Sequence, residues 1–279
     1  MENLSGMLLQ VIKNESEYKS MCASLSKFSA GGRRYTQGPL LATGLSDGVR
    51  NLLCAGLALE KFGVSETEDP NEASLIIVPD EKTAYSMQNR LSAFLENVRV
   101  FPARDFRFHN MGTTSNEWEF ERLRVLRELA HGKLDAVVTV PEAALCSLPP
   151  AEYMAQKKVL KIGDTVDPAE LSIILASYGY TSADTVEGAG QYSRRGDIFD
   201  IFVPDNDYPV RLEFFGDELD AAGYFDIMTQ RRTENVREIE ITPVREVAVS
   251  PEKAQNIVQR IDTLIKNAER KKDTSLVER

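Results

Sequence analysis

The spacing of hydrophobic and polar residues changes along the chain and divides it into regions. Residues 1–36 carry apolar positions three and four apart, which predicts a helical arm. Residues 37–152 alternate short apolar runs with amphipathic stretches. Here "GPLLATGLSDG" predicts a short strand and a turn before a helix, and residues 75–78 predict a nearly continuous strand before the next helix. Continuous apolar strands are typical of a parallel sheet covered by helices on both faces, so we expect an α/β domain.

The pattern after residue 152 is that of an antiparallel sheet. Residues 153–243 contain short alternating strands separated by Gly and Asp turns, with one helix that begins at Asp167 and Pro168. They predict a smaller α+β domain inserted into the first domain. Residues 244–279 contain a final amphipathic helix, whose apolar positions recur four apart at Ile257, Ile261 and Ile265. Because no further apolar element follows this helix, we expect the chain to be a truncated part of a longer protein.

One predicted strand of the antiparallel region leaves an aromatic residue on its polar side. Leu212 and Phe214 fall on one face of this strand, whereas Arg211, Glu213 and Phe215 fall on the other. An exposed Phe beside an Arg is typical of a protein interface. A bulge in the strand would instead turn Phe215 inward.

The composition is that of an ordinary globular protein, since 42% of the 279 residues are hydrophobic and 27% are charged. The formal net charge of −10 disfavours independent binding to a polyanion such as DNA. No apolar run approaches the roughly 18 residues of a membrane span, and the N-terminus lacks a signal-peptide pattern, so we expect a cytoplasmic protein with no membrane partner. The cysteines are few, odd in number and widely spaced, which predicts reduced core thiols at Cys22, Cys54 and Cys146.

A loop in the α/β region stands where a phosphate-binding loop would lie. Gly44 and Gly48 precede a predicted helix, as the glycines of such a loop do. The loop lacks the Gly-Lys-Ser/Thr sequence that neutralises phosphate charge, and Asp47 adds a negative charge instead. We therefore interpret it as the degenerate phosphate loop of a helicase-like domain and predict that it binds no nucleotide.

The two histidines offer little for catalysis or metal binding. His109 lies in a polar loop, and His131 lies next to Gly132 at the end of a predicted helix, where it interacts favourably with the helix dipole. Neither has a Cys or a carboxylate at the spacing of a metal site. We predict no metal, no cofactor and no catalytic residue.

Three segments resemble a known family: "RRGDIFDIF", "YPVRLEFFGDELD" and "FDIMTQRR". They are similar to the UvrB-homology module at the N-terminus of bacterial transcription-repair coupling factors, the Mfd family. The resemblance extends through "VFPARDFRFHNMGTTSNEWEFERLRVLREL" and "VVTVPEAALCSLPP" and covers roughly residues 38 to 279. Compared with UvrB itself, the phosphate-binding Lys is missing. The segment "DFRFHNMGTTSN" is also too short and too poor in Tyr to be the DNA-gripping hairpin of UvrB.

The resemblance implies a domain division. Residues 37–152 correspond to UvrB domain 1a without a functional phosphate loop, and residues 153–243 correspond to the UvrA-binding domain 2. Residues 244–279 correspond to the start of domain 1b, and residues 1–36 remain as the helical arm.

The resemblance also implies a partner and a set of binding residues. In this family the smaller domain docks on UvrA, the damage-sensing ATPase of nucleotide excision repair, and the matching positions here are Arg195, Arg211 and Phe215. Arg and aromatic residues dominate interface hot spots, which supports Arg211 and Phe215 independently. RNA polymerase and DNA are partners of regions of the longer protein that this sequence does not contain, so we expect a non-catalytic docking module.

Local ion pairs are the alternative interpretation for Arg195 and for Glu213, which lies between Arg211 and Phe215 on the same strand face. Arg195 could pair with Asp197 or Asp200, and Glu213 could pair with Arg195 or Arg211.

Two other functions remain open. The chain could be a nucleotide-binding half-motor, with "GLSDGVRN" holding a nucleotide through its backbone amides alone. It could also be a DNA-binding repair fragment, whose basic track would consist of Arg33, Arg34, Arg104, Arg107, Arg231 and Arg232.

Overall fold

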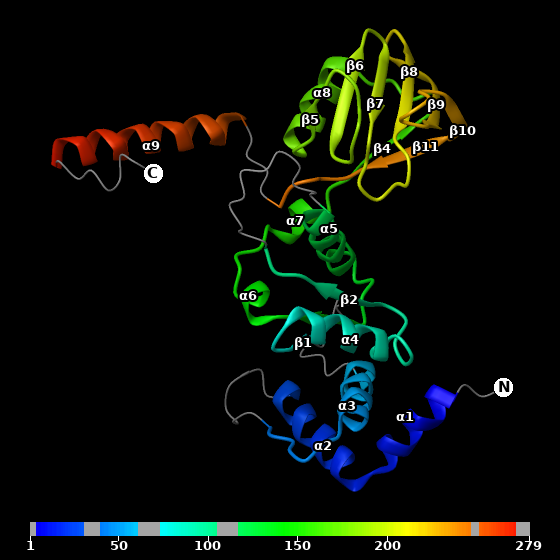
Figure 1. Ribbon diagram of the computed structural model, residues 1–279, viewed down its shortest axis with the longest axis vertical. Coiled ribbons are helices and arrows are strands. Elements are labelled where there is room, and N and C mark those ends of the chain that lie inside the picture. The colour runs from blue at the N-terminus through cyan, green and yellow to red at the C-terminus, as the bar shows by residue number, and fades with distance from the viewer. Residues whose placement is uncertain (1–3, 31–39, 61–72, 105–116, 247–250, 272–279) are drawn as a thin grey trace. The chain divides into compact units, whose positions relative to one another are not determined.

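The computed structural model describes residues 4–30, 40–60, 73–104, 117–246 and 251–271. The chain forms two compact units, residues 1–155 (unit 1) and residues 156–279 (unit 2) (Figure 1). The fold is mixed α/β, with a parallel sheet in unit 1 and antiparallel strands in unit 2, as the sequence predicts. Among the described residues we find no helix whose length and hydrophobicity would let it span a lipid bilayer.

Unit 1 begins with two helices and then alternates helices with strands. The first two helices lie in the region predicted as a helical arm, and the first contacts the third. The elements in chain order are α1 (Leu4–Asn14), α2 (Ser16–Ala30), α3 (Asp47–Glu60), β1 (Ser74–Ile77), α4 (Glu81–Leu91), β2 (Val98–Phe101), α5 (Glu117–Ala130), β3 (Ala136–Thr139), α6 (Pro141–Ala144) and α7 (Ala151–Met154).

The three strands of unit 1 form a parallel sheet in the order β1-β3-β2. The register aligns Ile76 of β1 with Val138 of β3, and Val138 with Val100 of β2. All residues of the central strand β3 are buried. Leu91 of α4 and Leu123 of α5 are fully buried in the same core, so helices and sheet share one hydrophobic cluster.

Three details of the prediction for unit 1 are wrong. Residues 40–43 form no strand, and Leu41 is 88% exposed. Strand β1 lies at the edge of the described sheet, and its residues Leu75 and Ile77 are 61% and 54% exposed, so one face of β1 is open. A strand forms only where a neighbouring strand is available for hydrogen bonding, and its faces are buried only where other segments pack on them. Both conditions depend on residues that are remote in sequence, so an apolar run alone does not predict them. The cysteines are free thiols as predicted, but all three are only partly buried.

Unit 2 is built mainly from short strands. Its elements in chain order are β4 (Lys158–Lys161), α8 (Pro168–Ser177), β5 (Thr181–Ser182), β6 (Gln191–Arg195), β7 (Ile198–Ile201), β8 (Val210–Phe215), β9 (Glu218–Phe225), β10 (Arg232–Asn235), β11 (Glu238–Ile241) and α9 (Pro251–Lys271). Helix α8 begins as predicted, because the Asp167 side chain accepts a hydrogen bond from the Ala169 backbone N–H at 2.7 Å and Pro168 occupies the first turn.

The main sheet of unit 2 has six strands in the order β10-β9-β8-β7-β6-β5, and β11 pairs with β4 in a separate two-stranded sheet. Neighbouring strands are antiparallel except for β5 and β6. The turns after β6 and β8 contain Gly196 and Gly216 with positive φ angles of 64° and 63°, a conformation that glycine adopts without steric strain. On the inner face, the rings of Phe199 and Phe214 meet edge to face at 5.8 Å. These hairpins fix the register of the strands that carry Arg195, Asp200, Arg211 and Phe215.

Helix α9 forms where the amphipathic pattern predicts it. Ile257 and Ile261 are 46% and 49% exposed and Ile265 is partly buried, so much of its apolar stripe is left uncovered by the described residues. Ser250, the predicted N-cap, lies outside the described residues.

Candidate docking surface

Strand β8 alternates between the core of unit 2 and the solvent. Leu212 is fully buried and Phe214 is 7% exposed, whereas Phe215 is 84% exposed. The predicted alternation of these side chains is therefore confirmed, and the aromatic side chain on the polar face points into water.

A bulge is present beside this strand, but it does not turn Phe215 inward. Glu213 pairs with Ala221 and Phe214 pairs with Leu219, so one extra residue, Asp220, is inserted between the two pairs. The extra residue belongs to β9, and the side chains of β8 keep their period of two.

The carboxylate of Asp200 joins two of the predicted binding residues. The register of β7 and β8 places Asp200 opposite Arg211, and its side chain is 1% exposed. Asp200 accepts hydrogen bonds from Arg211 Nε at 2.6 Å and Nη2 at 2.9 Å, and from Arg195 Nη2 at 2.6 Å. The local ion pair considered for Arg195 is thus present with Asp200, although the Arg195 side chain remains 50% exposed.

Arg211 is held from several sides and is only 18% exposed in its side chain. Its Nη2 donates to the Gln230 side-chain oxygen at 3.1 Å, and its guanidinium carbon lies 4.6 Å from the centre of the Phe225 ring. The hydrogen bonds to Asp200 raise the pKa of Arg211 against the opposing effect of burial. Arg211 therefore supports the sheet surface more than it is presented to solvent.

The other charged residue of β8, Glu213, has a partner that the sequence did not predict. Arg232 Nη2 donates to Glu213 Oε1 at 2.6 Å, so the predicted pairing with Arg195 or Arg211 is wrong. Arg232 comes from β10 and crosses β9 at Gly223, where an added Cβ would lie 2.9 Å from the Arg232 side chain. Glycine at this position makes room for the ion pair.

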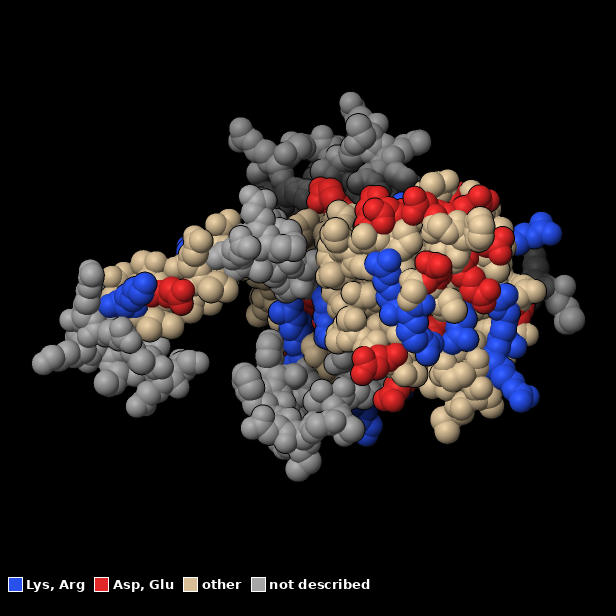
Figure 2. All heavy atoms as spheres, turned by 90° about the horizontal axis from the view of Figure 1, so that it is seen from above, with Lys and Arg blue, Asp and Glu red and all other residues tan. Residues whose placement is uncertain are grey.

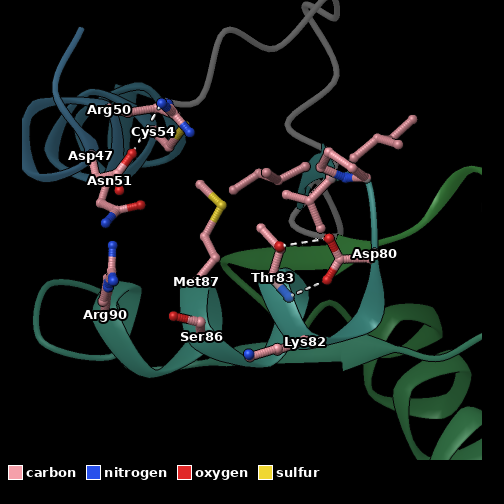
Figure 3. Close-up of a pocket in the computed structure, with 14 residues that line it drawn as sticks. Asp47, Arg50, Asn51, Cys54, Asp80, Lys82, Thr83, Ser86, Met87 and Arg90 are labelled. Atoms are coloured by element: carbon pink, nitrogen blue, oxygen red, sulfur yellow. Dashed lines mark hydrogen bonds and ion pairs between the residues drawn. The ribbon is translucent and has the colours of Figure 1, made fainter.

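The residues of the predicted degenerate phosphate loop lie in unit 1. Gly44 has a φ of 73°, and Asp47 begins α3 and forms an ion pair with Arg50 at 3.1 Å, visible at the edge of a pocket (Figure 3). Gly48 belongs to the first turn of the same helix. Because residues 40–43 form no strand, the strand, turn and helix arrangement on which the phosphate-loop prediction depended is not formed in the described structure.

Some of the other arginines and histidines considered from the sequence lie within the described residues, and others do not. Arg33, Arg34, Arg107 and His109 lie outside the described residues. Arg104 donates to the Ser147 carbonyl at 3.4 Å. His131 follows α5 as predicted, with Nδ1 2.8 Å from the carbonyl oxygen of Arg127.

The described residues contain no group of three or more His, Cys, Asp or Glu side chains that could hold a metal ion. Figure 2 shows basic and acidic side chains intermingled on the face of unit 2 that is seen from above.

Comparison with known proteins relates most of unit 2 to one protein family. Residues 159–246, which include all six strands of the main sheet, match the family described as "UvrB interaction domain". Most of unit 2 is therefore similar to a UvrB interaction domain.

The comparison with whole proteins is more specific. The chain is 28% identical over 229 residues to the transcription-repair-coupling factor of Bacillus subtilis (strain 168), and 29% identical over 245 residues to that of Staphylococcus aureus (strain USA300). These alignments cover 80% and 87% of this chain but 20% of each relative, so the chain spans about a fifth of the length of the curated relatives it matches. The predicted resemblance to the N-terminal module of the transcription-repair coupling factors is confirmed.

Proposed function

We propose that this chain is a non-catalytic docking module that recruits UvrA in transcription-coupled nucleotide excision repair. The observation that carries the proposal is the position of Phe215, which is 84% exposed on a sheet whose residues match the UvrB interaction domain. The strand holds this aromatic side chain in water, so its burial against a partner has a favourable free energy. Its full burial contributes roughly 1.5–3 kcal/mol.

Arg195 supplies the polar part of the proposed contact. Arg195 and Arg211 share the single carboxylate of Asp200, so the cluster keeps one positive charge in excess. Because Arg195 is half exposed and uses one of its five N–H donors on Asp200, we expect it to donate to an acidic side chain or a carbonyl of UvrA. Arg211 positions this surface through Asp200 and contributes less by direct contact.

The domain division follows the same proposal. Residues 37–152 would act as a UvrB domain 1a-like scaffold, with residues 44–48 as a degenerate phosphate loop that binds no nucleotide. Residues 153–243 would form the UvrA-binding domain, and residues 244–279 would begin the domain 1b segment. We place the module in the cytoplasm, and we assign RNA polymerase and DNA binding to other segments of the longer protein.

Calorimetric titration of the chain into UvrA tests the proposal. Phe215→Ala should weaken binding by about 2 kcal/mol or more, and Arg195→Ala should also weaken it. Leu145→Ala is the matched control, because Leu145 is a similarly exposed apolar residue (87%) but belongs to unit 1. The variant should bind as well as the parent chain.

Two results would contradict the proposal. A folded chain that fails to bind UvrA has a different partner, and a Phe215→Ala variant that binds normally means that another surface is used. Titrations with a fluorescent ATP analogue and with duplex DNA at several salt concentrations then test the two remaining functions, since DNA binding weakens steeply with salt.

A further inference from the structure

Unit 1 contains a pocket between α3 and α4, at the carboxyl end of strand β1 (Figure 3). Its volume is about 580 Å³, which is within the range of small-molecule sites. In α/β folds, ligands bind in crevices outside the carboxyl ends of the strands. The polar and charged side chains that line this pocket from the two helices include Arg50, Asn51, Lys82, Ser86 and Arg90.

Asn51 is a polar residue that α3 contributes to the pocket opposite Arg90. Its side chain lines the pocket, and the residue is only 7% exposed. No described residue forms a hydrogen bond with its amide group, and Figure 3 shows that group pointing from α3 toward Arg90 of α4. Asn51 is not among the described residues that bury a polar side-chain atom without a hydrogen-bond partner, so its amide is accessible from the pocket, where its N–H groups can donate to a ligand.

Some of the charged groups around the pocket have partners within the protein, and others do not. Arg50 is paired with Asp47, and the Asp80 carboxylate caps α4 by accepting hydrogen bonds from Thr83 N and Oγ1 at 2.8 and 2.9 Å. Both acidic groups are therefore already engaged within the protein.

Lys82 and Arg90, in contrast, form no ion pair or side-chain hydrogen bond with any residue that the structure describes, although the charge of Lys82 contributes to lowering the pKa of Asp80. They lie eight positions apart on α4 with Ser86 midway, so the three side chains follow one face of the helix at successive turns. Two unpaired cations facing one pocket, in a chain with a net charge of −10, indicate that the pocket is suited to an anion.

We propose that this pocket binds a small phosphorylated molecule. Its phosphate lies between the guanidinium of Arg90, which can donate two parallel hydrogen bonds, and the amide N–H of Asn51. The rest of the ligand extends along α4 past Ser86 to Lys82, which is about 12 Å from Arg90 along the helix axis. A ligand with a second anionic group therefore binds more tightly than one with a single phosphate. The site uses side chains of α3 and α4, not the backbone of residues 44–48, and all of its residues belong to unit 1, so it is independent of UvrA docking.

Thermal denaturation and NMR titration of the full chain with inorganic phosphate and pyrophosphate test this site. Both probes should raise Tm saturably, pyrophosphate at lower concentration, and the side-chain amide signal of Asn51 should shift. Arg90→Gln should weaken the binding at least tenfold. Asn51→Leu should also weaken it, because the leucine side chain cannot donate a hydrogen bond to the phosphate. Lys133→Gln, which removes an exposed cation of unit 1 outside the pocket, should leave binding unchanged.

Three results would overturn the proposal. The first is the absence of a saturable change with either probe, and the second is equal binding by the parent, Arg90→Gln and Asn51→Leu chains. The third is binding of a single-stranded oligonucleotide but not of pyrophosphate, which would assign the pocket to a nucleic-acid backbone.

Discussion

The buried carboxylate of Asp200 lies opposite Arg211 across strands β7 and β8 and accepts two hydrogen bonds from its guanidinium, at 2.6 and 2.9 Å. This pairing makes Arg211 part of the framework of the sheet. Phe215 lies on the same side of β8 but is 84% exposed, so the fold itself gains little from it. The proposed docking surface therefore combines a residue that holds it in place with a residue that is presented to a partner.

The first prediction concerns the two arginines that share Asp200. Arg211→Ala should lower the free energy of unfolding by about 2–3 kcal/mol, because a buried carboxylate loses two charged hydrogen bonds. Arg195→Ala should cost less than about 1 kcal/mol, because Arg195 is half exposed and Asp200 keeps Arg211. Urea denaturation measures both values. Equal losses would show that the two arginines support Asp200 to the same degree, against this prediction.

Phe214 and Phe215 are neighbours in sequence with opposite expected effects. Phe214→Ala should destabilise the chain by about 3–5 kcal/mol, because it opens a cavity in the core. Phe215→Ala should change stability by less than about 0.5 kcal/mol, because its side chain is exposed. Denaturation midpoints of the two variants check this contrast, and a large loss of stability for Phe215→Ala would mean that the residue packs against the fold.

Gly223 should tolerate no side chain. An added Cβ would lie 2.7 Å from the Glu234 carbonyl oxygen and 2.9 Å from Arg232, so Gly223→Ala should strain β10 and disturb the pair between Arg232 and Glu213. We expect a loss of about 1–3 kcal/mol by denaturation. Gly188→Ala is the control, because an added Cβ there meets nothing within 4 Å. If both substitutions are equally tolerated, the close approach at Gly223 is not required.

Asp80 should contribute stability that depends on pH. Hydrogen bonds from the Thr83 backbone and hydroxyl lower the pKa of Asp80 below its ordinary value. A carboxyl group with a lowered folded-state pKa stabilises the fold above its unfolded-state pKa of about 3.9, and this contribution is lost as the pH falls through the lower folded-state value. An NMR titration should find the pKa of Asp80 below that of an unfolded aspartate, and Asp80→Ala should reduce Tm more at neutral pH than at pH about 2. A pKa at or above the ordinary value would contradict the capping role.

Local periodicity was enough to predict several features of this protein. The alternation of β8 placed Leu212 and Phe214 inward and Phe215 outward, and the Asp167 cap located the start of α8. These predictions succeeded because side-chain direction in a strand and capping at a helix end depend on residues within a few positions of one another. The residue segments that resemble the transcription-repair coupling factors are also a property of the sequence alone.

Relationships between distant segments were decided only by the tertiary structure. The burial of Asp200 between two arginines and the passage of Arg232 over Gly223 depend on the register of five strands, β6 to β10. Arg122, an ordinary charged position in a helical pattern, is fully buried, where it donates to the Pro102 carbonyl and lies 4.0 Å from the centre of the Phe101 ring. The sequence alone thus determined the local elements and the exposed aromatic residue. The tertiary structure decided which charges are paired and which remain open to a ligand or partner, because pairing and burial are set by neighbours that are remote along the chain.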